Sequence, residues 1–241
     1  RRRVITEADL LPSWLRRLPA ALSPGGRRVW VSPFTLPLHG WHVQQLKRIA
    51  VAGLIDDDGL LFCDSDVAFV RDFDVGAIWQ DGAMRLYRAE NAAGETGVAD
   101  HLRWIAHAGR TLGVPEAHRP RHDYVSQFVT WRRQTVLDMC AHIETVHNRH
   151  WASVIGRSRK FSECMIYGAY VDAVLAGAGH IASNRAMGAV RWFDPAPTDA
   201  ELAAMIDGLG AHQVGIGVQS FVAMDAGRFR AAVLGEPAHA A

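Results

Sequence analysis

The segment that most constrains the fold is a short apolar run that ends in two acidic residues. Leu60-Leu61-Phe62-Cys63 leads directly into Asp64-Ser65-Asp66, and the turn Asp56-Asp57-Asp58-Gly59 precedes it. An apolar run of this length, opened by turn residues, predicts a buried strand of an α/β sheet. Because ligands of open α/β sheets collect at the carboxyl ends of strands, we expect both carboxylates to lie at a binding site.

Asp64 and Asp66 stand two residues apart, a spacing at which both can hold one divalent cation on a tight bend. Mg²⁺ and Mn²⁺ prefer oxygen ligands, and a cation held here could neutralise a diphosphate. The pattern alone is weak, since Asp56/Asp58 and Asp72/Asp74 repeat the spacing. Only the middle pair follows an apolar run. The structural alternative is a polar strand end that caps a neighbouring helix.

Composition places the chain among ordinary globular proteins. Its 241 residues suffice for one α/β domain, with 49% hydrophobic and 21% charged residues. The net charge of +1 offers no strong field for nucleic acid or an anionic membrane. No apolar run reaches the ~18 residues of a membrane span, and no secretory signal is apparent. We therefore expect no nucleic-acid partner and no transmembrane segment.

Three cysteines, Cys63, Cys140 and Cys164, lack any metal-binding spacing. An odd number at scattered positions favours reduced thiols and a cytoplasmic location over a disulfide framework. Cys63 is expected to pack as a small hydrophobic residue. The chain opens Arg1-Arg2-Arg3 without Met, so we expect it to lack an N-terminal piece.

Strand and helix patterns alternate along the chain, which predicts a single α/β domain over residues 1–241 with a loose tail from about Gly235. Gly and Pro residues separate the segments, and Ser162 and Thr198 are predicted helix N-caps. The predicted strands are 29–31, 60–63, 84–88, 124–131 and 214–218, and the predicted helices are 7–18, 39–52, 100–112, 134–146, 162–175 and 198–208.

Three further positions carry chemistry. Lys47, one of only two lysines, could place a point charge on a phosphate while the amide of Gln45 orients a ligand. Glu163 in the first turn of a predicted helix is either a carboxylate that complements the helix dipole or a catalytic group. Asp123 could be a metal ligand, an acceptor contact or a general base. For Lys47 and Asp123 the alternatives are a polar surface stripe and an exposed turn. His212 and Ser220 flank the last strand and would close the site.

Four blocks in order carry a resemblance to a known family: 40–47 (Gly-Trp…Gln-Gln-Leu-Lys), 62–66 (Phe-Cys-Asp-Ser-Asp), 129–133 (Val-Thr-Trp-Arg-Arg) and 161–168 (Phe-Ser-Glu…Tyr-Gly). With these four blocks in this order, the chain resembles a bacterial family of unknown function, domain of unknown function 6492. That family is regarded as glycosyltransferase-like, of the GT-A type. Members of that family usually begin with a further βαβ piece, which we expect this chain to lack, and Cys164 stands where an aromatic residue is expected.

The resemblance implies a fold with a GT-A-like, Rossmann-like mixed sheet flanked by helices. It also implies the function of a metal-dependent glycosyltransferase, with cell-envelope or polysaccharide glycan assembly as the expected setting. Asp64 and Asp66 would hold Mn²⁺ or Mg²⁺, and Gln45, Lys47, Asp64 and Ser65 would contact the nucleotide-sugar donor. Glu163 would be the general base or would orient the sugar, with Asp123 as the competing base. The acceptor would be a glycan or a small molecule.

Two other functions remain open. A haloacid-dehalogenase-type phosphohydrolase also places two aspartates after an apolar strand, the first as nucleophile. It needs a lysine farther along the chain, and Lys160 alone could serve. The third possibility is an inactive module that binds a nucleotide or a sugar.

Overall fold

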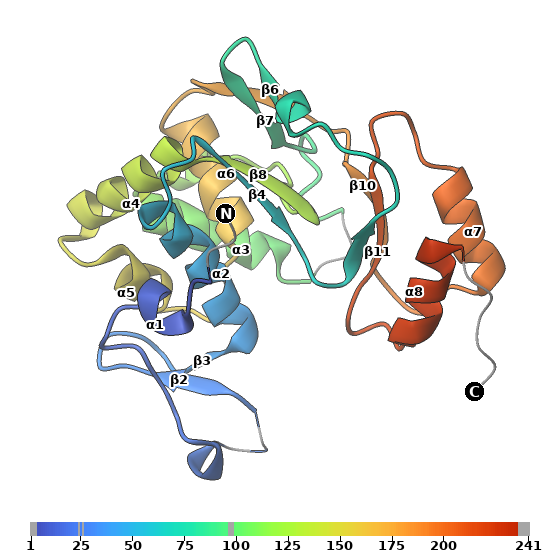
Figure 1. The fold of residues 1–241 in the computed structure, drawn as a ribbon. Coiled ribbons are helices and arrows are strands. Elements are labelled where there is room, and N and C mark those ends of the chain that lie inside the picture. Colours follow the sequence, from blue (N-terminus) through green and yellow to red (C-terminus); the bar gives the residue numbers. More distant parts are fainter. Residues whose placement is uncertain (1–3, 24, 26, 96–98, 236–241) are drawn as a thin grey trace.

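The computed structural model describes residues 4–23, 25, 27–95 and 99–235 and shows a mixed α/β fold (Figure 1). The strands are β1 (Arg16–Arg17), β2 (Val29–Val31), β3 (Leu38–His39), β4 (Gly59–Cys63), β5 (Val67–Phe69), β6 (Trp79–Gln80), β7 (Ala83–Tyr87), β8 (Phe128–Arg132), β9 (His180–Ser183), β10 (Gly188–Arg191) and β11 (Gly215–Val218). The α-helices are α1 (Glu7–Leu10), α2 (Gly40–Ala50), α3 (His101–Leu112), α4 (Arg133–His147), α5 (Trp151–Ile155), α6 (Glu163–Ala173), α7 (Asp199–Asp207) and α8 (Ala226–Leu234).

The predicted strand before the acidic pair is present as β4. It pairs antiparallel with β8 from Gly59 opposite Arg132 to Cys63 opposite Phe128. Leu60 is buried, whereas Cys63 is exposed at the end of the strand. The expectation that Cys63 packs as a small hydrophobic residue is therefore wrong, because the strand leaves the core one residue before the acidic pair. All three cysteines have free thiols.

The acidic pair marks the passage from one sheet to another. After β4 the chain bends at Asp64, whose carbonyl oxygen accepts a hydrogen bond from the Val67 amide (3.3 Å). It then continues as β5, which pairs antiparallel with β11, and β11 pairs parallel with β10. The α/β class is confirmed, but the described strands form four small sheets, β1-β2-β3, β10-β11-β5, β4-β8 and β6-β7-β9.

Helix α6 forms the centre of the largest core. Every residue from Glu163 to Val171 is buried, as expected for a helix covered on all sides, and α2, α3 and α4 pack against it (Figure 1). The predicted N-cap is confirmed, since the Ser162 hydroxyl accepts a hydrogen bond from the Met165 amide (3.4 Å). On the sheet side, the Tyr167 ring stacks on Trp131 at 4.8 Å between ring centroids. This packing fixes where α6 begins.

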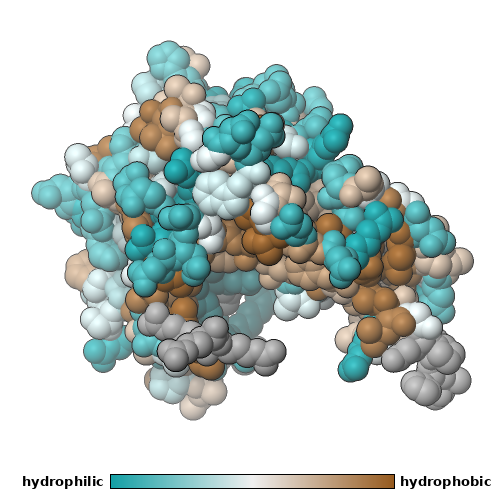
Figure 2. Space-filling model, turned by 45° about the horizontal axis from the view of Figure 1, so that its top comes forward, coloured by the Kyte–Doolittle hydropathy of each residue, from teal (hydrophilic) through white to brown (hydrophobic). Residues whose placement is uncertain are grey.

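The C-terminal part has its own small core. Leu202 of α7, Ile216 and Val218 of β11 and Val222 are buried together, and α7 and α8 pack against each other beside β11. Figure 1 shows these helices to one side of the body formed by α2 to α6. Figure 2 shows the surface hollowed between the two parts, with hydrophobic side chains gathered across the middle of the molecule.

Several predicted boundaries are wrong for local reasons. The helix predicted over 7–18 ends at Leu10, because Leu11 precedes Pro12 and takes an extended conformation. The strand predicted over 124–131 begins at Phe128, because Asp123 instead forms an isolated bridge with Ala89. The elements that were not predicted are β1, β3, β5, β6, β9, β10, α5 and α8. The tail predicted after Gly235 lies outside the described residues.

Over the described ranges, no helix is both long enough and apolar enough to cross a membrane.

Because His107 is buried, we expect the free energy of unfolding to decrease in mild acid. Burial, with a smaller effect of Arg110, lowers the pKa of His107 from 6.5 to about 4. As the pH falls through this interval the unfolded chain binds a proton that the folded chain does not bind, so the free energy of unfolding decreases. The full loss is on the order of 3 kcal/mol relative to neutral pH.

Urea unfolding of the wild type and His107→Gln at about pH 7 and about pH 4.5 tests this effect. The variant should lose less stability between the two conditions, whereas His118→Gln, at an exposed position, should behave as the wild type. Burial also lowers the pKa values of His42 and His180, so some acid sensitivity should remain in H107Q. An unchanged pH dependence in H107Q would contradict the assignment.

Candidate functional site

A single arginine joins two of the predicted site residues. Arg48 of α2 donates from Nη1 to Glu163 Oε1 (2.7 Å) and from Nη2 to Asp64 Oδ1. The exposed fraction of the side chain is 15% for Arg48, 26% for Asp64 and 5% for Glu163. Charge-assisted hydrogen bonds of this kind, largely removed from water, fix the relative positions of α2, the end of β4 and the start of α6. We call Arg48, Asp64 and Glu163 the arginine cluster.

Gln45 lies next to this cluster, one turn before Arg48 on the same face of α2. Its Oε1 accepts a hydrogen bond from the Glu163 amide (2.9 Å), one of the free amides at the start of α6. The acceptor role fixes which amide atom faces α6. The other atom, Nε2, is buried and has no partner among the described residues. Buried donors are almost always paired, so the unpaired Nε2 is a candidate contact for a ligand.

Lys47 does not join the arginine cluster. Residues two apart on a helix face different ways, and the Lys47 ammonium lies 3.6 Å from Glu7 Oε2 of α1, both side chains being about a third exposed. The positive charge next to Asp64 and Glu163 belongs to Arg48, which the sequence analysis did not single out. Its position one turn after Gln45 was the available signal.

Asp66 is held by the C-terminal sheet instead. Its Oδ2 accepts a hydrogen bond from the Ser220 amide (2.9 Å), and its carbonyl oxygen accepts one from the Val218 amide (3.2 Å). Ser220 therefore contacts Asp66 through its backbone, whereas the exposed His212 precedes β11. The Oδ1 atom of Asp66 is buried without a partner among the described residues, and Ser65 between the two aspartates is exposed.

The carboxylates fit a cation that is bound together with phosphate. Within the described residues no group of three or more His, Cys, Asp or Glu side chains could hold a metal ion. Mg²⁺ in nucleotide sites is commonly held by one or two carboxylates, with phosphate oxygens and water completing its coordination. Asp64 and Asp66 supply that number, and the buried Oδ1 of Asp66 lacks the partner that such a cation would provide.

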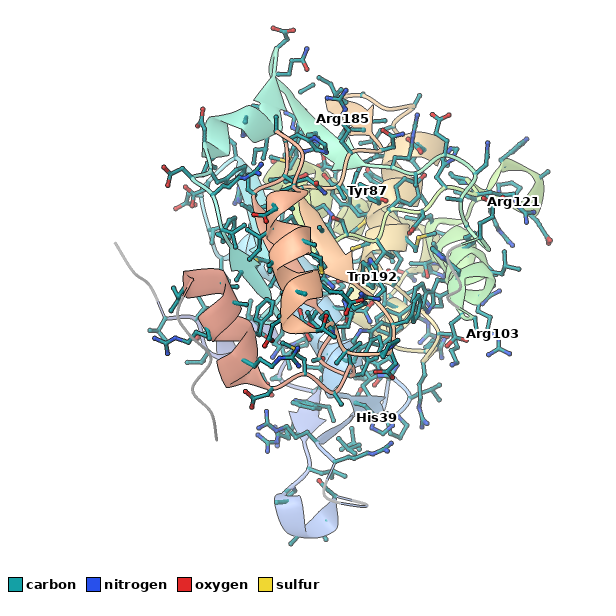
Figure 3. All side chains as sticks on the ribbon, turned by 90° about the vertical axis from the view of Figure 1, so that its right-hand side faces the viewer. His39, Tyr87, Arg103, Arg121, Arg185 and Trp192 are labelled. Carbon is teal, nitrogen blue, oxygen red and sulfur yellow. The ribbon has the colours of Figure 1, made fainter. Side chains whose placement is uncertain are left out.

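A cavity of about 340 Å³ adjoins this region, and its wall includes Tyr87, His101, Trp104, Asp123, Gln127 and Trp192. Tyr87 and Trp192, labelled in Figure 3, reach it from β7 and from the segment after β10. Phe128, the first residue of β8, also lines the cavity, and it pairs with Cys63 at the end of β4. The cavity therefore lies beside the point where the chain enters Asp64.

Asp123, the competing candidate base, is part of the cavity wall. It is 8% exposed, its Oδ1 accepts a hydrogen bond from the Val125 amide (2.9 Å), and the same oxygen lies 3.1 Å from His101 Nε2. Burial raises the pKa of the Cys164 thiol well above its usual value, and the charges of Glu163 and Asp123 raise it further. Both candidate carboxylates are thus close to Cys164, and only Asp123 faces the cavity.

The position of Lys160 weighs against the phosphohydrolase. Its ammonium lies 2.5 Å from Asp100 Oδ2 in an exposed ion pair, and the cation that contacts Asp64 is Arg48. In a haloacid-dehalogenase-type enzyme, the nucleophilic aspartate needs a lysine from farther along the chain beside it. Lys160 does not lie beside Asp64 in this structure, because it is paired with Asp100.

Removing the Arg48 charge should lower the stability of the fold. Arg48→Met leaves two largely buried carboxylates without their cation, which should lower the free energy of unfolding by about 2–4 kcal/mol. The adjacent Lys47→Met breaks only an exposed pair and should change it by less than about 1 kcal/mol. Urea unfolding of both variants measures the difference.

Equal losses in R48M and K47M would contradict the assignment of Arg48 as the residue that holds the site together.

The sequence model of a family of unknown function, DUF6492, matches residues 1–207. Comparison with curated proteins finds no match. The matched region contains the arginine cluster, Gln45, Asp66 and Asp123, and it ends with α7, before β11 and Ser220.

Proposed function

The chain belongs to the family of unknown function DUF6492, and we propose that it is a metal-dependent glycosyltransferase that uses a nucleotide-sugar donor. The proposal extends to a GT-A-like fold and to a glycan or small-molecule acceptor. One observation carries it: two buried polar atoms, Gln45 Nε2 one turn before Arg48 and Asp66 Oδ1 just after β4, have no partner among the described residues. An amide donor, a guanidinium and two carboxylates suit a diphosphate bound with a cation.

The charges explain why a metal would be needed. Two carboxylates, those of Asp64 and Glu163, contact the one guanidinium of Arg48, and Asp66 follows two residues after Asp64, so the site is negative before a ligand arrives. A diphosphate adds more negative charge and would be repelled by a site of this kind. When bound, Mn²⁺ or Mg²⁺ on Asp64 and Asp66 would neutralise the diphosphate and act as a Lewis acid on the leaving group.

The chain's own residues would position the donor. Gln45 presents Nε2 to a phosphate oxygen while its Oε1 remains on the Glu163 amide. Arg48, oriented by Glu163, can turn a guanidinium N–H toward the diphosphate. The exposed Ser65 lies between the two aspartates and is free to contact the ribose or phosphates of the donor. Lys47 pairs with Glu7 instead, so we assign it no contact with the donor.

The position of the cavity distinguishes the two candidate general bases, Asp123 and Glu163. A general base must lie within hydrogen-bond reach of the acceptor hydroxyl. Asp123 lines the cavity, whereas Glu163 is engaged by Arg48 and does not. We therefore assign acceptor deprotonation to Asp123 and positioning of Arg48 to Glu163. In a retaining reaction Asp123 would orient the sugar instead.

Binding of a donor should require both the metal and Asp66. In thermal unfolding with a panel of nucleotide sugars, a donor at ~100 times its dissociation constant stabilises by about 2.7 kcal/mol, a shift of roughly 5–11 °C at this size. We expect the shift only with Mn²⁺ or Mg²⁺ present and not in Asp66→Asn. That amide can still accept the Ser220 hydrogen bond, so D66N should fold.

Asp57→Asn, in the exposed turn before β4, is the matched control and should keep the shift. A shift in D66N equal to that of the wild type would contradict the metal assignment. Metal-dependent release of the nucleoside diphosphate from the same donor separates the transferase from an inactive binding module, because a transferase commonly loses its donor sugar slowly to water.

A further inference from the structure

The cavity beside the arginine cluster has a wall that is mainly aromatic and apolar. Trp104 of α3 and Trp192 after β10 contribute indole rings, and Phe128 and Phe193 add phenyl rings. Its volume of about 340 Å³ is at the lower end of the range for small-molecule sites. Aromatic faces with a few polar groups between them suit a compact ring that has one apolar face and hydroxyl groups at its edge.

Two polar groups of the wall, Gln127 and Asp123, offer hydrogen-bond acceptors to a ligand. Gln127 is 4% exposed, and its Oε1 is buried with no partner in the part of the chain that the structure describes. Asp123 adds a carboxylate. Burial raises the pKa of the Tyr87 hydroxyl, and Asp123 raises it further, so this phenol stays protonated. An unpaired buried acceptor is costly, so a ligand that brings O–H or N–H donors would stabilise the site.

Charge restricts the ligand further. Among the residues that the structure describes, no lysine or arginine lines the cavity, and Arg103, Arg121 and Arg185, labelled in Figure 3, are not part of its wall. His101 is directed at Asp123, with its Nε2 3.1 Å from the carboxylate. A carboxylate or phosphate on the ligand would therefore meet Asp123 and the Gln127 oxygen without a cation of its own, which opposes binding.

We propose that this cavity binds a sugar ring that carries no negative charge, a neutral or amino sugar, and that it rejects uronic acids and sugar phosphates. The ring packs against Trp104 and Trp192 and donates a hydroxyl or amino hydrogen to Gln127 Oε1. The inference rests on the proposed glycosyltransferase function and names its sugar class. The ring belongs either to the acceptor or to the sugar of the donor, and the same chemistry recognises both.

Saturation-transfer NMR with methyl glycosides tests the proposal. The probes are the methyl glycosides of glucose, galactose, mannose, glucosamine and N-acetylglucosamine, with methyl glucuronide as the acidic counterpart, each titrated without nucleotide or metal. We expect saturation transfer to at least one neutral or amino glycoside and at least tenfold weaker binding of the glucuronide. A second arm repeats the titration with nucleoside diphosphate and Mn²⁺ present, and adds the corresponding nucleotide sugars.

Gln127→Leu and Trp104→Ala should each weaken binding of the preferred glycoside, Q127L by about fivefold, as expected for one hydrogen bond. Q127L should fold, because the oxygen that it removes has no partner. Gln134→Leu, on the exposed face of α4, is the matched control and should bind as the wild type. Binding in the first arm assigns the ring to the acceptor, and binding only in the second arm assigns it to the donor.

Three results would overturn the proposal: no glycoside binding in either arm, glucuronide binding as tight as that of the neutral glycosides, or full binding in both Q127L and W104A. The proposed function fails separately, through the absence of a metal-dependent response to nucleotide sugars. Binding of neutral glycosides without that response would retain the cavity assignment and leave a sugar-binding protein.

Discussion

The guanidinium of Arg48 is the interaction on which the arrangement of the site depends. It contacts Asp64 at the end of β4 and Glu163 at the start of α6, residues separated by 99 positions, and so brings two distant segments against α2. A cation with so little exposure is stable only while both carboxylates are present, and each carboxylate needs the cation in turn. Gln45 adds a second link between α2 and the start of α6, because its Oε1 accepts a hydrogen bond from the Glu163 amide.

The two aspartates of the central motif belong to different parts of the molecule. Asp64 is tied through Arg48 to the helical body, whereas Asp66 is tied to Ser220 and Val218 at the end of β11. A ligand that bridges both carboxylates would therefore couple the body to the C-terminal sheet. The family match ends at residue 207, so the partners of Asp66 come from outside the matched region. This division makes the C-terminal sheet part of the site.

Sequence patterns predicted the helices and strands whose formation depends on residues adjacent in the chain. The apolar run before Asp64 predicted β4, and Ser162 predicted the start of α6, because a strand and a capped helix depend on adjacent residues. The contacts of Arg48 depend on residues far apart in sequence, so the sequence analysis chose Lys47, its neighbour on another face of α2. The pairing of β5 with β11 and the exposure of Cys63 were missed for the same reason, since both follow from the bend after β4.

The measurement that tests the account most directly is anomalous X-ray diffraction from crystals soaked with a nucleoside diphosphate and Mn²⁺. The account predicts one Mn²⁺ peak bound by Asp64 and Asp66, with phosphate oxygens on the metal and within hydrogen-bond distance of Arg48 and Gln45 Nε2. A Mn²⁺ peak at other residues, or a diphosphate bound away from Arg48, would contradict it.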